Sequence, residues 1–242
     1  MMNDIQILII DYGSQYTLVI GRALRELGIR SVILPIQKAE NWLKENTPKA
    51  VILSGSNWSV YGEGAPELPP SFDITGEKYF ILGICYGMQI LAYKGGGTVD
   101  RPHSHREYGP AKTSFDITHP LFSNVIQDSI VWASHGDTVT KLPDGFTKIA
   151  ESRGIAGMTN KNNTVFGIQF HPEVNDTKEG KKILQNFLTI SNCVKDWNPE
   201  DLVLQIQKEV LDITDKEKNK NVVLGVSGGV DSTVLAGVLF PV

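Results

Sequence analysis

Short runs of apolar residues alternate with amphipathic stretches along the first part of this chain. Each run contains hardly any polar residue, which is typical of a strand that is buried on both faces. The repeated order of strand, helix and strand predicts a parallel sheet with helices on both faces and functional loops at the carboxyl ends of its strands. The predicted strands are residues 5–10, 31–34, 50–53 and 79–82.

The stretch after the first predicted strand has the spacing of an amphipathic helix. Ile20, Ala23, Leu24 and Leu27 fall at i, i+3, i+4 and i+7 and therefore share one helical face. Gly28 follows directly, as expected of a residue that ends a helix. Further helices are predicted around Trp42 and at residues 88–94 and 178–189.

The hydrophobic pattern changes between residues 107 and 165. Short apolar runs there alternate with turns such as Pro143-Asp144-Gly145, a rhythm that is typical of antiparallel strands. We expect these strands to form a small antiparallel subsheet packed beside the main parallel sheet. The predicted fold class is therefore α/β, with a mainly parallel sheet flanked by helices.

A new helix start follows this first domain. Asn198 has the character of an N-cap, Pro199 suits the first helical position, and Glu200 favours the first turn. The helix is predicted to run to about Leu211, and the charged stretch at residues 215–221 is interpreted as a solvated linker.

Composition limits the classes of function. The chain has 242 residues, of which 41% are hydrophobic and 21% charged, with a formal net charge of −4, so nothing indicates affinity for nucleic acid or for a membrane surface. Two cysteines, Cys85 and Cys193, are too few for a disulfide framework and suit a reducing compartment. Neither a signal peptide nor a membrane span is expected, which predicts a cytoplasmic location.

Cys85 carries the strongest chemical signal in the chain. It lies between an apolar run and the start of a predicted helix, with Gly83 and Gly87 on either side. Glycines allow the tight strand-to-helix turn that presents a nucleophile, and the N-terminus of the helix offers backbone N–H donors to an anion. The alternative, a small buried core cysteine, is disfavoured by these flanking features.

His171 and Glu173 follow another apolar run, at residues 165–168. A histidine can act as a base toward the Cys85 thiol, and a carboxylate two residues later can orient the imidazole ring. The sequence therefore predicts a Cys-His-Glu catalytic triad.

These motifs resemble those of the class I, triad-type glutamine amidotransferases, over about residues 4–190. The resemblance implies a flavodoxin-like α/β fold and the release of ammonia from glutamine for a synthetase partner, without a cofactor for the glutaminase reaction. It also implies that Cys85 is the nucleophile, that His171 is the general base and acid, and that Glu173 holds the imidazole.

The loop after the third predicted strand departs from the family's usual sequence. The family reads Ser-Gly-Gly-Pro, whereas this chain reads Ser54-Gly55-Ser56-Asn57. The backbone N–H groups of Ser56 and Tyr86 are the candidate oxyanion donors, with Gly55 beside them. If the position of Ser56 needs a positive φ, the strain costs about 1 kcal/mol or more and weakens the oxyanion hole.

Other polar residues have two interpretations each. Gln89 either contacts glutamine or packs within its helix, and His135 either helps to bind glutamine or is structural. No paired Cys/His spacing supports a metal site, so His103, His105 and His119 are interpreted as loop residues and no metal ligand is predicted. The resemblance implies that the substrate-binding segment includes Ser134, His135, Gly136 and Asp137.

A glycine-rich loop follows one more predicted strand, at residues 222–226, and precedes an apolar helix. Backbone N–H groups in such a loop cradle phosphate, although the spacing here is not that of Walker A. The loop resembles the pyrophosphate-binding loop of the N-type ATP pyrophosphatases; the alternative is an ordinary glycine-rich turn. The resemblance implies contacts to the phosphates of ATP from Ser227, Gly228, Gly229, Val230, Asp231, Ser232 and Thr233.

An amidotransferase followed by an ATP pyrophosphatase resembles the domain order of the glutamine-hydrolysing GMP synthase family. In that family, ammonia aminates xanthosine 5′-monophosphate (XMP) to GMP in an ATP-dependent step of purine nucleotide biosynthesis. The resemblance implies ATP and Mg as cofactors of the complete synthetase domain, which is mostly absent here, and a homodimer for the full-length enzyme. The predicted domains are an amidotransferase at residues 4–192, a junction helix and linker at residues 193–221, and a truncated ATP pyrophosphatase domain at residues 222–242.

Two other functions stay open. One is the glutaminase of another synthetase, such as those for anthranilate or carbamoyl phosphate. The stretches at residues 105–111 and 227–232 disfavour this function. The other is a truncated, non-catalytic amidotransferase-like subunit that only binds a synthetase. The altered loop at Ser56 and the early end of the chain favour this function.

Overall fold

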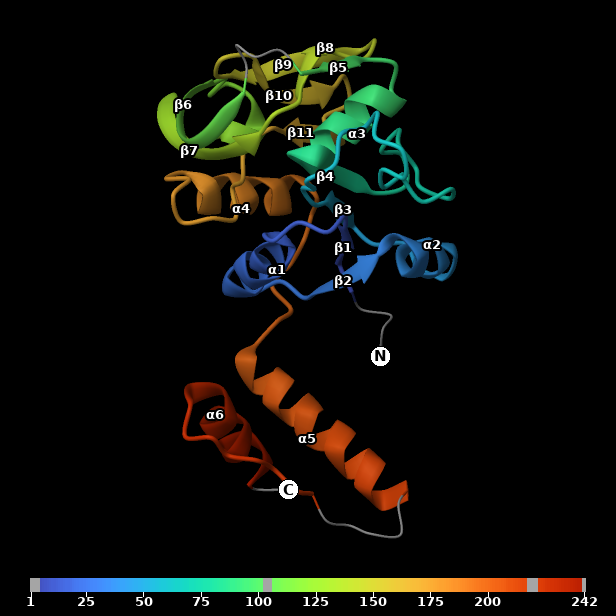
Figure 1. Cartoon of the computed structure of the whole chain (residues 1–242), viewed down its shortest axis with the longest axis vertical. Helices are drawn as coiled ribbons and strands as arrows, with labels where there is room; N and C mark the ends of the chain where they lie inside the picture. Colours follow the sequence, from blue (N-terminus) through green and yellow to red (C-terminus); the bar gives the residue numbers. More distant parts are fainter. Residues whose placement is uncertain (1–4, 102–105, 217–221, 241–242) are drawn as a thin grey trace. The chain divides into compact units, whose positions relative to one another are not determined.

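The chain divides into two units, Met1–Asp196 and Trp197–Val242 (Figure 1). The computed structural model describes residues 5–101, 106–216 and 222–240. Within these ranges, no helix is long and apolar enough to cross a membrane.

Strands and helices alternate in the first part of this unit, as the apolar runs predict, and a series of strands follows. The strands are β1 (Ile7–Asp11), β2 (Ser31–Pro35), β3 (Ala50–Leu53), β4 (Phe80–Ile84), β5 (Thr98–Asp100), β6 (Glu107–Phe115), β7 (Asp128–His135), β8 (Thr138–Lys141), β9 (Phe146–Glu151), β10 (Ile155–Asn160) and β11 (Val165–Ile168). The helices are α1 (Thr17–Glu26), α2 (Ile36–Glu45), α3 (Tyr86–Lys94), the 3-10 helix η2 (Pro120–Phe122) and α4 (Gly180–Ile190).

A mixed sheet forms the centre of this unit, with nine strands in the described residues and the order β2-β1-β3-β4-β11-β10-β9-β6-β7. Neighbours from β2 to β11 in this order run parallel. Because successive side chains of a strand point to opposite faces, Ile7 and Ile9 of β1 pack with α1 and α4, whereas Leu8 and Ile10 pack with α2 and α3. The predicted α/β class, with a parallel sheet and helices on both faces, is confirmed.

The antiparallel strands are arranged differently from the prediction. They do not form a subsheet beside the main sheet: β10 pairs with β11, and β9, β6 and β7 extend the same sheet from there. Among the described residues, the separate ladder consists of β5 and β8. The apolar runs predicted these strands but not their partners, because the parallel strands leave one side of β11 open for pairing, and the sequence does not show which strand reaches it.

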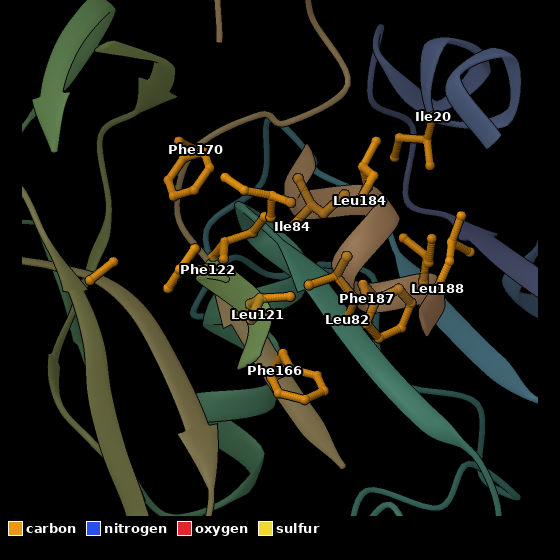
Figure 2. Packing of buried hydrophobic residues seen from close by; sticks show 14 of the residues in the cluster. Ile20, Leu82, Ile84, Leu121, Phe122, Phe166, Phe170, Leu184, Phe187 and Leu188 are labelled. Carbon is orange, nitrogen blue, oxygen red and sulfur yellow. The ribbon is translucent and has the colours of Figure 1, made fainter. Parts of the chain in front are cut away.

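Figure 2 shows the buried apolar cluster that holds the middle of the sheet against α4. Leu82 of β4 and Phe166 of β11 pack with Leu184 and Phe187 of α4, and none of the four is more than 1% exposed. The rings of Phe166 and Phe187 meet edge to face, with centroids 5.9 Å apart. Each such side chain contributes about 1.5–3 kcal/mol by burial, so the two adjacent strands are firmly placed.

The segment after α4 is fastened to the amino ends of the first strands. The Gln6 side chain donates to the Val194 carbonyl at 2.6 Å and accepts from its N–H at 2.9 Å. The Arg30 N–H donates to the Asp196 carboxylate at 2.7 Å, and the Asp196 N–H donates to the Gly28 carbonyl at 2.9 Å. These bonds hold the chain on the first unit as far as Asp196.

The second unit contains two helices, α5 (Pro199–Lys216) and α6 (Val230–Leu239). Asn198 accepts a hydrogen bond from the Glu200 N–H at 3.2 Å, in agreement with its prediction as an N-cap. The helix α5 ends at Lys216 and not near Leu211, because the residues that follow Leu211 include no glycine or proline that would stop it. Residues 217–221 of the predicted linker lie outside the described ranges.

The strand predicted at residues 222–226 is wrong. These residues have no regular secondary structure, and Val223 is 95% exposed. A strand needs a neighbour to satisfy its backbone groups, and the described part of this unit offers only the helices α5 and α6. The last helix also begins earlier than predicted, at Val230 and not at Thr233.

Two glycines permit the turn between β4 and α3. A Cβ added to Gly83 would lie 2.5 Å from the backbone carbon of Gly87, and a Cβ added to Gly87 would lie 2.4 Å from the carbonyl oxygen of Leu53. Both clashes are with backbone atoms, which cannot rotate away. The glycines are therefore required for close approach, as the sequence predicts.

We expect Gly87→Ala to lower the free energy of unfolding by about 1–3 kcal/mol or more, because β3 and α3 must move apart. Gly21→Ala is the matched control, since its Cβ would meet only the flexible tip of Ile33 at 2.9 Å. Urea denaturation of both variants measures the effect. Equal midpoints for the two variants would contradict the tight fit at Gly87.

Candidate active site

Cys85 occupies the turn between β4 and α3. Its backbone has φ 54° and ψ −105°, a conformation that is strongly disfavoured for residues other than glycine. Its N–H donates to the Ile168 carbonyl at 2.8 Å, which ties the turn to β11. Only 3% of the residue is exposed, and Sγ lies 3.7 Å from the Ser134 carbonyl oxygen. The turn therefore presents the thiol beside the end of β7.

His171 and Glu173 lie in the loop after β11, the strand next to β4 in the sheet. The parallel register pairs Ile84 with Ile168, so the turn after β4 and the loop after β11 leave the same edge of the sheet. His171 Nδ1 lies 2.7 Å from Glu173 Oε1, with both side chains buried, and Cys85 is close enough to affect the pKa of the imidazole. The structure thus brings the three predicted triad residues together.

The charge state of His171 follows from these contacts. Burial on its own lowers the pKa of a histidine, because it disfavours the charged form. The Cys85 and Glu173 side chains beside the ring outweigh burial and raise the pKa of His171 to about 10. The imidazole therefore holds two protons at neutral pH, and one of them is available for transfer.

A cavity of about 230 Å³ opens beside Cys85. Its volume suits a small molecule, and its wall combines residues from the turn after β3, the start of α3 and the end of β7. The predicted site residues that line it are Ser56, Cys85, Gln89, Ser134, His135, Gly136 and Asp137. The lining residues without a predicted role are Asn57, Trp58, Arg101, Arg106 and Tyr108.

Gly55 and Tyr86, two further residues of the predicted site, do not line this cavity. A Cβ on Gly55 would lie 3.1 Å from Cε1 of His171 and 3.6 Å from Cβ of Cys85, so this glycine packs directly against the triad. Tyr86 opens α3, and its phenol is directed away from the cavity, where it donates to the Pro66 carbonyl at 2.6 Å.

Ser56 does not carry the strain that the sequence suggests. The non-glycine residues with positive φ in the described ranges are Cys85, Asn124, Asn163 and Asn192, so Ser56 has an ordinary backbone conformation. Its hydroxyl donates to the Tyr12 carbonyl at 2.8 Å and thereby ties the loop to the end of β1. The condition for backbone strain at Ser56, a positive φ, is therefore not met.

Gln89 is fully engaged within the protein. Only 3% of it is exposed, and its amide nitrogen donates to the Asp137 carbonyl at 2.8 Å. Gln169, to which the sequence assigns no role, is buried beside it and has its amide nitrogen 3.7 Å from Cys85 Sγ. Gln169 stands two residues before His171 in the sequence, and this position could have indicated that it lies near the triad.

His135 and Asp137 belong to a polar network at the wall of the cavity. His135 Nε2 lies 3.4 Å from Glu107 Oε2, and Asp137 pairs with Arg101 at 2.5 Å. Burial acts to raise the pKa of Glu107, but hydrogen bonds from His135 and Ser152 outweigh it and hold that pKa below its usual value. The wall is therefore charged, with both signs present.

Comparison with known proteins identifies the family. Residues 8–191 match the family described as Glutamine amidotransferase class-I. The chain belongs to this family.

Curated relatives of this amidotransferase chain are named GMP synthase [glutamine-hydrolyzing]. Those of Brachyspira hyodysenteriae and Aliarcobacter butzleri are 43% and 42% identical over 98% of this chain, and the match covers 46% of each relative. The chain thus spans about half the length of the curated relatives it matches.

Solved structures support the same fold. A protein from Thermoplasma acidophilum, described as a candidate subunit of GMP synthase, is 32% identical, with a TM-score of 0.64 over 77% of this chain and 93% of that one. A glutamine amidotransferase from Thermotoga maritima has a TM-score of 0.57 over 96% of this chain and 97% of that one, but at 22% identity it supports the fold alone.

The predicted ATP-binding residues lie apart from the amidotransferase site in sequence, within the second unit. Gly228 has φ +83°, the Ser232 hydroxyl accepts from the Ser227 N–H at 3.2 Å, and Thr233 Oγ1 donates to the Gly229 carbonyl at 2.8 Å. Val230 and Asp231 open α6. The loop is thus a compact turn before a helix, but without the predicted strand behind it.

No group of three or more His, Cys, Asp or Glu side chains that could hold a metal ion occurs in the part of the chain that the structure describes. His119 bonds with the Asn163 side chain at 2.9 Å and accepts from the Leu121 N–H. His103 and His105 lie outside the described ranges.

The contacts of His171 predict a pH dependence of stability. A histidine whose native pKa is raised stabilises the fold below its unfolded pKa of about 6.5, and this stabilisation is lost as the pH rises through the native value, here about 10. The free energy of unfolding of the wild type exceeds that of His171→Asn by a certain amount. We expect this difference to decrease as the pH rises from the lower to the higher of these two values. Urea titrations at intervals across this window measure the difference, and a difference that grows with pH would contradict the assignment.

Proposed function

We propose that the first unit hydrolyses glutamine to glutamate and ammonia, with Cys85 as nucleophile, His171 as general acid and base, and Glu173 as the group that orients the imidazole. The observation that carries the proposal is the 2.7 Å contact between His171 and Glu173 beside a thiol that faces a cavity. The doubly protonated imidazole also suits a mechanism in which the first proton goes to a leaving amine.

The reaction proceeds in two stages. In the reacting pair the thiol proton of Cys85 resides on His171, which accounts for the two protons of the imidazole. The Cys85 thiolate attacks the side-chain amide carbon of glutamine, His171 gives this proton to the nitrogen, the C–N bond breaks, and ammonia leaves. A thioester remains on Cys85. His171 then takes a proton from water, the hydroxide attacks the thioester carbon, and glutamate leaves as the thiol is restored. The N–H groups of Ser56 and Tyr86 donate to the oxyanion formed in each stage.

Recognition of glutamine follows from the charges of the cavity. The substrate carries a carboxylate and an ammonium group on its α-carbon. Arg106 supplies positive charge for the former, and the ion pair of Arg101 with Asp137 places one charge of each sign at the wall of the cavity. Buried Gln89 fixes the Asp137 carbonyl. The segment formed by Ser134, His135, Gly136 and Asp137 therefore serves as the wall that selects an amino acid.

The ammonia is proposed to serve the amination of XMP to GMP. The support is the naming of the curated relatives, with which the match extends through both units of this chain. We assign residues 4–192 to the amidotransferase domain, 193–221 to the junction, and 222–242 to the start of an ATP pyrophosphatase domain. Residues 227–233 would contact the phosphates of ATP. The Mg that accompanies ATP would be held by a complete synthetase domain. The full-length enzyme would be a homodimer.

Cys85→Ala should abolish glutamine hydrolysis and leave the fold intact, because only the nucleophilic atom is removed. Cys193→Ala is the matched control and should retain activity, since burial raises the pKa of the Cys193 thiol and keeps it unreactive. Glutamate release, with and without a separately produced ATP pyrophosphatase domain, measures the effect. A diazo-ketone analogue of glutamine should label Cys85.

Two outcomes would overturn the triad assignment. One is undiminished hydrolysis by Cys85→Ala, and the other is labelling of Cys193 in place of Cys85. A folded wild type that releases no glutamate even with the synthetase domain would favour the non-catalytic binding subunit.

Ser56→Gly should not raise kcat, because Ser56 has no unusual φ to relieve. Loss of the hydroxyl bond to the Tyr12 carbonyl loosens the loop that holds an oxyanion donor, so kcat should fall by up to about tenfold while KM changes little. Ser59→Gly, in the same loop, is the control. A clear rise in kcat for Ser56→Gly would show that the serine hinders the oxyanion hole.

A further inference from the structure

Tyr16 lies directly against the imidazole of His171. The centroids of the two rings are 4.7 Å apart, and their planes are inclined by 58°, a geometry that is typical of favourable aromatic pairs. Tyr16 is the residue before α1 and therefore approaches the triad from a different element than Cys85 or Glu173. It does not line the cavity beside Cys85.

The hydroxyl of Tyr16 is held from the opposite side by Trp132 of β7, whose indole N–H donates to it at 3.2 Å. The same tryptophan is bonded to the loop of His171. The backbone carbonyl of Trp132 accepts from the His171 N–H at 2.9 Å. Its backbone N–H donates to the Thr177 hydroxyl at 2.9 Å. That hydroxyl in turn donates to the His171 carbonyl at 2.6 Å. Trp132 therefore fixes both the backbone of His171 and the ring that covers its side chain.

The turn that carries Tyr16 is itself fixed at the end of β1. The Asp11 carboxylate accepts from the Gly13 N–H at 2.9 Å and from the Thr17 hydroxyl at 2.7 Å. The Tyr16 N–H donates to the Ser14 hydroxyl at 3.1 Å. The start of α1 is thus built as a rigid support for a ring that reaches the triad.

We propose that Tyr16 is a positioning residue that holds the His171 imidazole in the orientation needed for proton transfer. This inference rests on the proposed glutaminase activity. A single hydrogen bond to Glu173 fixes Nδ1 but allows the ring to tilt about that bond. The tyrosine ring packs against the imidazole and limits this tilt. The nearby aromatic ring also favours the doubly protonated imidazole, since a cation within about 6 Å of an aromatic centroid is attracted to it.

The test compares Tyr16→Leu and Tyr16→Phe with Tyr61→Leu. Tyr61 is a matched control because it also packs against an aromatic ring, that of Tyr93 with centroids 5.1 Å apart. We expect Tyr16→Leu to lower kcat by about 10- to 100-fold through misplacement of the imidazole, with KM for glutamine within about twofold of the wild type, because Tyr16 does not line the cavity.

Tyr16→Phe keeps the ring and loses only its bond with Trp132, so a smaller loss of kcat is expected. Trp132→Phe should then lower kcat by a smaller factor when it is added to Tyr16→Phe than when it is made in the wild type, because the two changes remove the same bond. A loss that appears in KM and not in kcat would overturn the proposal, as would equal effects of Tyr16→Leu and Tyr61→Leu.

A second measurement does not depend on turnover. The ring signals of His171 in an NMR spectrum should shift in Tyr16→Leu and stay in place in Tyr61→Leu, since an aromatic ring shields the imidazole beneath it. Unchanged His171 signals in Tyr16→Leu would overturn the inference. If the wild type releases no glutamate although Tyr16 controls these signals, the proposed function fails and the contact with Tyr16 stands.

Discussion

The parallel pairing of β4 with β11 is the interaction on which the rest of this molecule depends. It aligns Ile84 with Ile168, so that the turn bearing Cys85 and the loop bearing His171 leave the same edge of the sheet. Residues that are 86 positions apart in the sequence thereby come close enough for Cys85 to affect the pKa of His171. A change in this register of even one residue would turn the side chains of a strand to the wrong faces and separate the triad.

That arrangement costs conformational strain, which the surrounding core must offset. Cys85 keeps a positive φ, which costs of order 1–3 kcal/mol. The backbone contacts at Gly83 and Gly87 and the buried packing of Leu82 and Phe166 on α4 leave the turn no room to relax. Strain of this kind is found where a side chain must be presented in one direction, and here that side chain is the candidate nucleophile.

The sequence predicted what local chemistry determines. The glycines around Cys85 and the acid two residues after His171 are close in sequence to the groups they serve, so the triad could be proposed from the sequence alone. Tyr16, Trp132 and Arg101 could not be assigned in this way, because they reach the site through strand pairing across the whole first unit. Ser56 shows the opposite case: the sequence suggested strain, and a hydrogen bond to the Tyr12 carbonyl accounts for the residue without it.

The fold was predictable to the same extent. Parallel strands were recognisable from their apolar runs, whereas the partners of the antiparallel strands were not, because β-pairing depends on which edge is free in three dimensions. The strand predicted at residues 222–226 failed for a related reason: its apolar character is real, but a strand exists only beside another one, and the described residues of the second unit supply none.

The fastening of residues 193–196 to the first unit fixes the point at which the chain leaves this unit. Gln6, Gly28 and Arg30, which hold Val194 and Asp196, precede β1 and β2, whereas Cys85 and His171 follow β4 and β11. The chain therefore leaves this unit at the end of the parallel strands remote from the thiol. For any acceptor carried beyond Asp196, the length and stiffness of the tether, and not the position of its anchor, would set the effective concentration of that acceptor at the mouth of the cavity.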